Sequence, residues 1–429
     1  MTHSPSEAGP TVDRYHLLGR PADLAGHRDT FGPLPLPAGR NRVWSQSLVD
    51  AVERAGLTGR GGAAFPSAIK LVVARAGGGQ GSIIVNGMEG EPASDKDKVL
   101  LTRAPHLVLD GAQLLAAACG ANEVVVCIPE GRDAVAAAVT NAIAERSVHH
   151  RNGTHASEVV VRPPDRFVAG EESALAQWLA SGQSLPTFRP DKSSPLRIGK
   201  RPLLVHNTET LAHVALIARD GPEAFRAHGL TEEPGTTLVT ISGAVVQPGV
   251  VEVDRGTPLH EIVARSTPND DIRAMLVGGY GGTWVGPAHF GTGYASISLR
   301  TIGASAGVGV IVALGQSSCG VSESARIAGY LARQSAGQCG PCVFGLPAIA
   351  EDLARLAQGK PDPMLMARLL RRLDEVDGRG ACRHPDGAVA MVRSALSVFA
   401  ADVGAHSRGE PCAHWSAPTQ LRFPAPRAQ

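Results

Sequence analysis

Hydrophobic residues follow two alternating patterns in the first half of the chain. Short apolar runs lie at Ser82–Val85, Glu123–Ile128, Val159–Val161 and Leu203–Val205, and stretches with helical spacing lie at Val43–Arg54, Leu107–Ala118 and Ala134–Arg146. Short apolar runs predict strands, and apolar positions three or four residues apart predict helices. Strands that alternate with helices form mostly parallel sheets covered on both faces. We therefore predict an α/β domain over residues 41–230.

The pattern changes after residue 235. Short strands at Thr237–Ile241, Gly249–Val253 and Met275–Val277 are expected around one helix, Leu259–Ala264. This arrangement predicts a small β-grasp-like module over residues 235–315.

The remainder of the chain divides into helices and two polar ends. Residues 322–400 carry the apolar spacing of amphipathic helices, which predicts a helical domain over residues 320–403. Residues 1–40 are polar and rich in proline and glycine, and we expect them to form an extended arm. Residues 404–429 are expected to form a disordered tail.

Composition and charge favour a cytoplasmic protein. The chain has 429 residues with a formal net charge of +1, which argues against a nucleic-acid partner or a polybasic membrane arm. The longest apolar run, around Val308–Leu314, is much shorter than the ~18 residues of a membrane helix. The first residues lack the pattern of a signal peptide. We therefore expect no direct membrane insertion.

A glycine-rich loop is the first candidate site. It reads Gly59-Arg60-Gly61-Gly62-Ala63-Ala64-Phe65-Pro66, and the helix expected after it carries Lys70. Glycines let backbone N–H groups face an anion, the helix adds its positive end, and Arg60 and Lys70 add full charges. A phosphate or dinucleotide site is one interpretation. A structural turn is the other, because the spacing matches no standard phosphate motif.

Two acidic loops follow predicted strands. The first contains Asn86, Glu89 and Glu91, and the second contains Gly170-Glu171-Glu172. Parallel sheets bind ligands at the carboxyl ends of their strands, and the Asn86 amide offers both donors and an acceptor. The glutamates have simpler interpretations as solvated residues or as the acidic start of a helix.

Three of the seven cysteines form a candidate metal motif. Cys339-Gly340-Pro341-Cys342 is a C-x-x-C loop, and Cys382 follows it. Such thiolates converge on a metal or an iron–sulfur cluster. Zinc with His384 as a further ligand, or two core cysteines, are the alternatives. The other four, Cys119, Cys127, Cys319 and Cys412, are interpreted as small buried or tail residues.

Taken in order, these loops resemble those of the NADH-binding flavoprotein subunit of respiratory complex I and its relatives in NAD-reducing hydrogenases and formate dehydrogenases. The segments that carry the resemblance are Gly56–Pro66, Asn86–Pro92, Phe167–Leu175 and Asn207–Leu211. Residues 235–315 resemble the family's soluble-ligand-binding module, and the C-terminal helices resemble its iron–sulfur bundle.

The resemblance implies a Rossmann-like FMN-binding domain, hydride transfer from NADH, and electron release through a 4Fe–4S cluster to other redox subunits or a ferredoxin-like protein. It assigns FMN to Gly59, Arg60, Gly61, Gly62, Lys70, Asn86, Glu89, Gly170, Glu171, Asn207 and Thr210. It assigns NADH to Phe65, Lys70, Glu91 and Glu172. It assigns the cluster to Cys339, Cys342 and Cys382.

The chain departs from the family pattern at several positions. Ala336 stands where the first cluster cysteine is expected, which leaves a non-cysteine fourth ligand, a 3Fe–4S cluster, or an empty or zinc site as outcomes. Ala64 replaces a glycine of the flavin loop. Met88, Val73, Lys192 and His206 replace residues expected around the nucleotides. An FMN-dependent oxidoreductase subunit is the primary hypothesis, and a non-catalytic scaffold or docking subunit is the alternative. A third hypothesis is a binding role led by residues 235–315.

Overall fold

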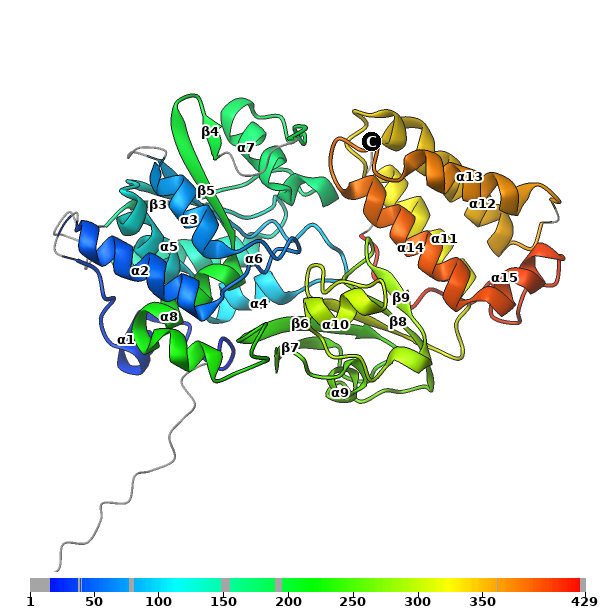
Figure 1. Ribbon diagram of the computed structural model, residues 1–429, viewed down its shortest axis with the longest axis horizontal. Helices are drawn as coiled ribbons and strands as arrows, with labels where there is room; N and C mark the ends of the chain where they lie inside the picture. The colour runs from blue at the N-terminus through cyan, green and yellow to red at the C-terminus, as the bar shows by residue number, and fades with distance from the viewer. Residues whose placement is uncertain are drawn as a thin grey trace, which may run out of the picture.

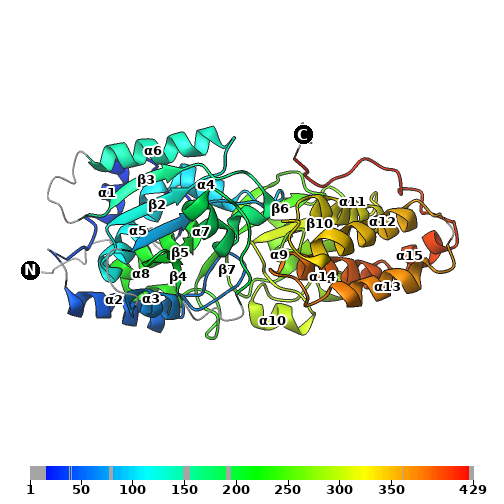
Figure 2. The ribbon, with the colours of Figure 1, turned by 90° about the horizontal axis from the view of Figure 1, so that it is seen from above.

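The computed structural model describes residues 16–37, 39, 41–76, 81–147, 155–189, 195–360 and 362–424. An α/β domain and a helical bundle lie at opposite ends of the molecule, and a second, smaller α/β unit lies between them (Figures 1 and 2). The fold class expected from the sequence is confirmed.

The first domain is built on a mostly parallel sheet. Its strands are β1 (Ser82–Asn86), β2 (Glu123–Cys127), β3 (Ser157–Val161), β4 (Leu196–Ile198) and β5 (Arg201–Asn207). Their order is β3-β2-β1-β5-β4, and only the edge strand β4 is antiparallel. The chain leaves β1 for β2 on one side and reaches β5 on the other. The carboxyl ends of β1 and β5 therefore form the switch point at which such sheets bind ligands.

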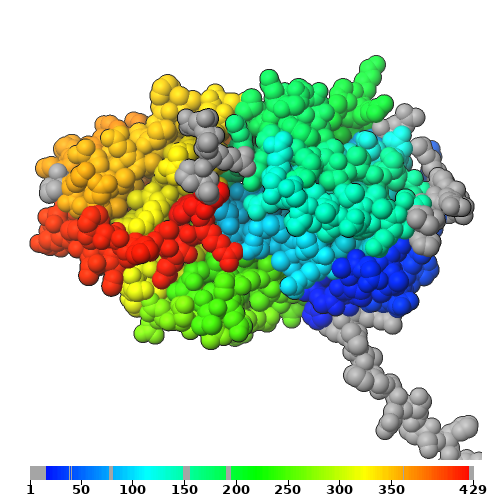
Figure 3. All heavy atoms as spheres, turned by 180° about the vertical axis from the view of Figure 1, so that it is seen from behind, coloured from blue at the N-terminus to red at the C-terminus, as the bar shows by residue number. Residues whose placement is uncertain are grey.

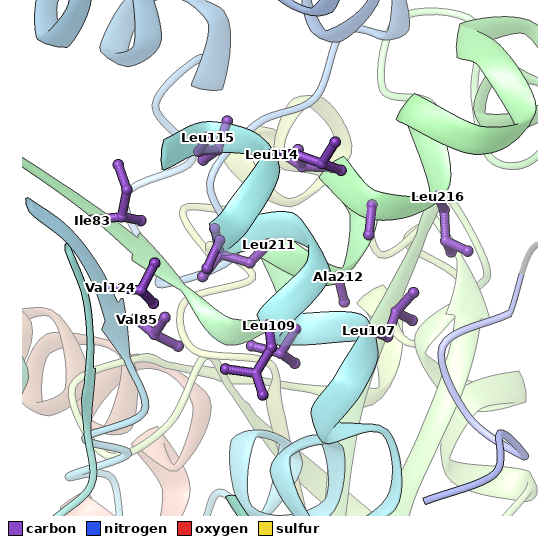
Figure 4. Close-up of a cluster of buried hydrophobic side chains, with 14 of the residues drawn as sticks. Ile83, Val85, Leu107, Leu109, Leu114, Leu115, Val124, Leu211, Ala212 and Leu216 are labelled. Carbon is purple, nitrogen blue, oxygen red and sulfur yellow. The ribbon is translucent and has the colours of Figure 1, made fainter. Parts of the chain in front are cut away.

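Helices cover both faces of this sheet. They are α1 (Leu24–Phe31), α2 (Arg42–Ala55), α3 (Ser67–Ala76), α4 (Lys96–Arg103), α5 (Pro105–Cys119), α6 (Asp133–Ser147), α7 (Glu172–Ser181) and α8 (Thr208–Arg226). Ile83 and Val85 point into the core with α5 and α8 (Figure 4). Ile84 lies on the opposite face, in a cluster with Leu175 of α7. A Cβ at Gly111 would lie 1.9 Å from the Leu211 carbonyl oxygen, so this glycine lets α5 and α8 touch.

The middle unit is a five-stranded mixed sheet. It contains β6 (Thr236–Gly243), β7 (Gly249–Asp254), α9 (Leu259–Ala264), β8 (Ile272–Val277), β9 (Thr283–Val285), α10 (Ser296–Thr301) and β10 (Val310–Gly315). The order is β7-β6-β10-β8-β9, with β6 and β10 parallel in the centre and α9 against one face. This is the β-grasp-like arrangement expected from the sequence. The apolar run at Val308–Leu314 supplies its central strand.

The C-terminal bundle packs on the other face of that sheet. It consists of α11 (Gly320–Arg333), a π-helical turn (Pro341–Gly345), α12 (Leu346–Ala357), α13 (Leu365–Val376), α14 (His384–Val398) and α15 (Ala400–Ser407). In the described residues no single helix is long and apolar enough to cross a bilayer, although α14 and α15 together, bent by 85°, meet the length and composition test.

Both ends of the chain differ from expectation. Residues 1–15 lie outside the described part, but Leu24–Phe31 is a helix rather than an extended arm, held by a 2.8 Å contact between His27 and buried Asp110. Residues 408–424, expected to be disordered, run back along the bundle toward the first domain (Figure 3). Ser322 donates to the Trp415 carbonyl, and Arg422 pairs with Asp95. Specific hydrogen bonds, which composition does not reveal, hold this segment.

Candidate functional site

Two asparagines define the centre of the candidate site. Asn86 ends β1 and Asn207 ends β5, and the two residues are direct register partners. The Asn207 side chain caps α8 by accepting from the Glu209 N–H at 3.0 Å. The positive end of α8 therefore starts at the switch point of the sheet, where an anion is favoured.

The glycine-rich loop lies over this point. A Cβ at Gly61 would lie 3.5 Å from the Asn207 Cβ, and the Arg60 N–H donates to the Thr210 hydroxyl at 2.9 Å. Gly62 has φ +107°, which suits glycine. Ala64, at the position where the family loop has glycine, also has a positive φ of +48°. The loop therefore keeps a glycine-like backbone although one glycine is missing.

The tip of this loop offers backbone donors. The N–H groups of Gly61, Gly62 and Ala63 have no acceptor among the described residues, and all three residues are exposed. Consecutive free N–H groups beside helix N-termini form an anion-binding concavity. This observation fits the phosphate of a mononucleotide such as FMN.

A third loop, at Gly170–Glu172, closes the site from the other side. Asn86 donates from its side-chain nitrogen to the Gly170 carbonyl at 2.8 Å and accepts from the Met88 N–H at 3.3 Å. Met88 is 1% exposed and packs into the core beneath the loop, so it presents no polar group there. Glu171 caps α7 by accepting from the Ser173 and Ala174 N–H groups. Glu171 therefore acts as the acidic start of a helix, which is the simpler of the two interpretations made from the sequence.

The carboxylates of two further glutamates, Glu89 and Glu91, accept hydrogen bonds from backbone N–H groups of the protein. Glu89 accepts from the N–H groups of Asp97 and Lys98 and so caps α4. Glu91 accepts from the Tyr280 N–H at 2.8 Å and joins the first domain to the middle unit. Burial raises the pKa of each carboxyl to about 7, and the neighbouring Asp97 adds to the rise at Glu89. Neither carboxylate is directed at the glycine-rich loop by these contacts.

A buried charge network lies beneath the two asparagines. Lys96 is 2% exposed and contacts Asp97, Glu209 and Asn207 at 2.9–3.0 Å. Glu209 also lies 3.7 Å from the Arg60 guanidinium. Burial disfavours the charge of Lys96, but Asp97 and Glu209 raise its pKa overall. Sequence reasoning missed this network because Asp95-Lys96-Asp97-Lys98 has the composition of a solvated helix face.

The residues assigned to NADH separate into two places. Phe65, Lys70 and Glu172 line one small cavity of about 50 Å³, together with Val73. Lys70 and Glu172 form an ion pair across it. Glu91 is not part of this cavity.

Two other positions differ from the family pattern around the nucleotides. Burial and the charge of Lys70 lower the pKa of His206 to about 3, so this ring is neutral. Lys192 lies outside the described residues.

The three motif cysteines come together. Cys342 interacts with both Cys339 and Cys382. Burial is the main cause that raises the pKa of Cys342 to about 12, and the neighbouring Cys339 adds to the rise. Burial also acts to raise the pKa of Cys339, but the N–H groups of Ala381 and Cys342 lower it overall. Their sulfurs do not form a group within 4.8 Å of one another in the described residues. At least one pair of these sulfurs is therefore more than 4.8 Å apart, wider than the ~3.8 Å between two sulfurs on one tetrahedral zinc ion.

The fourth cluster position has no thiolate. The Ala336 backbone hydrogen-bonds to Cys342, so Ala336 lies beside the motif without offering a ligand atom. His384 is a second neighbour, because its backbone bonds to Cys382. Its Nε2–H donates to the Leu331 carbonyl at 2.8 Å, which leaves the lone pair on buried Nδ1 without a partner among the described atoms. The residues present therefore fit a cluster held by three thiolates.

The α/β domain and the bundle each match a known protein family. Residues 52–216 match the Nuo51 FMN-binding domain, and residues 322–406 match the NADH-ubiquinone oxidoreductase-F iron–sulfur binding region. Between them, the two matches cover the glycine-rich loop, both asparagines and all three motif cysteines.

Whole-chain comparisons agree with these matches. The second F-type NADH-quinone oxidoreductase subunit of Rhizobium meliloti is 29% identical over 380 residues, covering 85% of this chain and 90% of the relative. Its F-type counterpart in Rickettsia typhi is 27% identical and covers 82% and 87%. A crystal structure of an NAD+-reducing NiFe-hydrogenase superposes with a TM-score of 0.79 and 27% identity, covering 94% of this chain and 68% of that one. The chain belongs to the FMN- and iron–sulfur-binding flavoprotein family that includes the F-type subunits of NADH-quinone oxidoreductases.

Proposed function

We propose that this chain is an NADH-oxidising flavoprotein subunit that passes electrons through an iron–sulfur site held by Cys339, Cys342 and Cys382. The pairing of Asn86 with Asn207 beneath Gly61 carries the proposal, because it places free backbone donors and the N-terminus of α8 at the switch point of a parallel sheet. Bound FMN would accept a hydride from NADH and release electrons singly.

Each residue would act by holding or orienting a nucleotide. Gly61 and Gly62 would bind phosphate through their N–H groups, while Gly59, Arg60 and Thr210 fix the loop above α8. Asn86 and Gly170 would border the flavin ring. Phe65, Lys70 and Glu172 would receive the nicotinamide nucleotide after the ion pair between Lys70 and Glu172 opens.

The third loop links the two redox sites. Asn86 bonds to Gly170, and the adjacent Glu171 is close enough to Cys382 to raise the pKa of that thiol, after the larger effect of burial. Phe167 stacks edge-on against His384, with ring centroids 5.3 Å apart. One short segment therefore touches the flavin side and the cysteine side, which supports electron transfer between them. Other redox subunits or a ferredoxin-like protein would be the acceptor.

Reduction by NADH tests this function. Anaerobically purified protein should show flavin absorption that NADH bleaches. Phe65→Ala should raise the KM for NADH and leave the FMN content unchanged. Bound FMN that NADH never reduces would contradict the proposal.

A docking subunit without redox chemistry is the second candidate, favoured by Ala336 and by the small, ion-paired cavity at Lys70. Protein that stays colourless after reconstitution with FMN, iron and sulfide would support this candidate.

A further inference from the structure

A second group of potential metal ligands lies at the far end of the bundle. It consists of Cys319, His406 and Cys412, whose ligand atoms all lie within 4.8 Å of one another. Cys319 precedes α11, His406 belongs to α15, and Cys412 begins the segment that runs back toward the first domain. Cys319 and His406 are buried, and Cys412 is half-buried. Three separate parts of the chain thus bring sulfur and nitrogen together at one point.

The histidine is oriented for coordination through Nε2. Its Nδ1 lies 3.0 Å and 3.2 Å from the carbonyl oxygens of Ala357 and Leu356, so Nδ1 carries the proton. The lone pair is then on Nε2, which lies 3.6 Å from the Cys319 sulfur. Carbonyl anchoring of the other ring nitrogen is the usual support of a metal-binding histidine. Nε2 also accepts the Cys412 N–H at 3.3 Å, a long bond that a metal would replace.

The spacing and the charges suit Zn²⁺. A tetrahedral zinc ion with Zn–S of about 2.3 Å and Zn–N of about 2.05 Å places sulfur and nitrogen ~3.5 Å apart, close to the observed 3.6 Å. Two thiolates and a neutral imidazole give a neutral complex with Zn²⁺, which lowers the cost of burial. The Ser322 N–H donates to the Cys319 sulfur at 3.4 Å, and the His414 backbone hydrogen-bonds to Cys412. Burial and the neighbouring Cys319 still raise the pKa of Cys412 to about 11, so a bound ion would have to displace the thiol proton.

We propose that Cys319, His406 and Cys412 bind one Zn²⁺ ion, with solvent on the half-exposed side of Cys412 as the fourth ligand. This site is separate from the iron–sulfur site, since the 14 residues of α11 lie between Cys319 and the cysteine motif and such a helix is ~21 Å long. Binding releases the two thiol protons, so zinc affinity rises with pH.

The ion would fasten the start of the C-terminal segment. Beyond Cys412, Arg326 donates to the Ala417 carbonyl and Tyr280 donates to the Arg422 carbonyl. Arg422 then reaches Asp95, next to the buried Lys96 of the first domain. Zinc bound at Cys412 therefore stabilises residues 412–424, the segment that joins the bundle to the first domain.

Metal analysis of the full-length chain tests the proposal. Protein purified anaerobically from medium containing Zn²⁺ should carry zinc and iron together. Cys412→Ala should lose zinc, weaken Zn²⁺ binding by more than about tenfold, and speed proteolytic cleavage after residue 408, with iron and FMN retained. Cys339→Ser should lose iron and keep zinc. Cys119→Ala, at another half-buried cysteine, is the matched control and should keep both metals.

Substitution with Co²⁺ gives a second readout that does not depend on stability. The wild-type chain should show a thiolate-to-cobalt absorption band that Cys412→Ala and His406→Gln both remove. Zinc content unchanged in Cys412→Ala would overturn the proposal. So would freshly prepared wild-type protein that binds no zinc, or one in which Cys319 and Cys412 are joined by a disulfide.

Discussion

Asn86 and Asn207 are opposite each other on one rung of the sheet, yet their side chains serve different partners. Asn86 donates to Gly170 in the third loop, whereas Asn207 contacts Lys96 and Asp97 in the buried charge network. The Asn86 side chain therefore holds the third loop, which would border the flavin under the proposed function. The Asn207 side chain instead joins the end of β5 to the charge network buried inside the domain.

Asn86→Ala should weaken FMN binding without unfolding the protein. The substitution removes the bond to Gly170 and frees the third loop, and the loss of one hydrogen bond costs about 1–1.5 kcal/mol, or roughly tenfold in FMN affinity. Fluorescence titration of the apoprotein with FMN measures the effect. Asn141→Ala, on the exposed face of α6, is the matched control. Equal FMN affinity in the two variants would remove Asn86 from the site.

Glu91 should make the protein less stable as pH rises. Its pKa is about 7 in the folded chain against an ordinary value of 4.5, so the folded state holds the proton more tightly than the unfolded state. The associated stability is present below pH 4.5 and is lost as pH rises to about 7, by about 3 kcal/mol. Glu91→Gln should flatten this part of the stability–pH profile in urea unfolding between pH 4.5 and 8. Glu130→Gln on an exposed turn is the control, and parallel profiles for wild type and Glu91→Gln would contradict the assignment.

Local patterns predicted much of the fold. The helix Leu259–Ala264 has the expected bounds, and the strand of β1 follows an unbroken apolar run. Both signals are encoded by neighbouring residues. The helix α4 was missed because its first turn carries Lys96 and Asp97, and their burial depends on Glu209, a residue distant in the sequence.

The sequence predicted which residues belong to the candidate site better than it predicted which residues those side chains contact. The predicted strand Ser82–Val85 indicated that Asn86 would lie at a strand end, but its pairing with Asn207 was not predicted and comes from the structure. Nothing local indicated that Glu91 would bind the Tyr280 N–H or that Cys319 would meet Cys412, because these contacts join separate units of the chain. The domain boundaries and the individual ligand assignments stay predictions.

Ala64→Gly should stabilise the glycine-rich loop. Ala64 has φ +48°, a conformation that costs a non-glycine residue about 1–2 kcal/mol. The greater freedom of glycine in the unfolded chain takes back about 0.4–1 kcal/mol, which leaves a gain of roughly 0.5–1 kcal/mol in the free energy of unfolding. Ala63→Gly, at the adjacent position without positive φ, should destabilise the chain instead. Urea midpoints that shift in the same direction for both variants would show that the loop carries no strain at Ala64.

Ala336→Cys should complete the iron–sulfur motif. The Ala336 backbone already hydrogen-bonds to Cys342, so a thiol at this position would start beside the other three sulfurs. Reconstitution with iron and sulfide should give a higher iron content, because a fourth thiolate supplies the ligand that one iron of a 4Fe–4S cluster otherwise lacks. The neighbouring Gly337→Cys, at φ +65° and facing open space, serves as the control for adding a thiol to the same turn. Iron content that rises equally in both variants would mean that position 336 has no special relation to Cys339, Cys342 and Cys382.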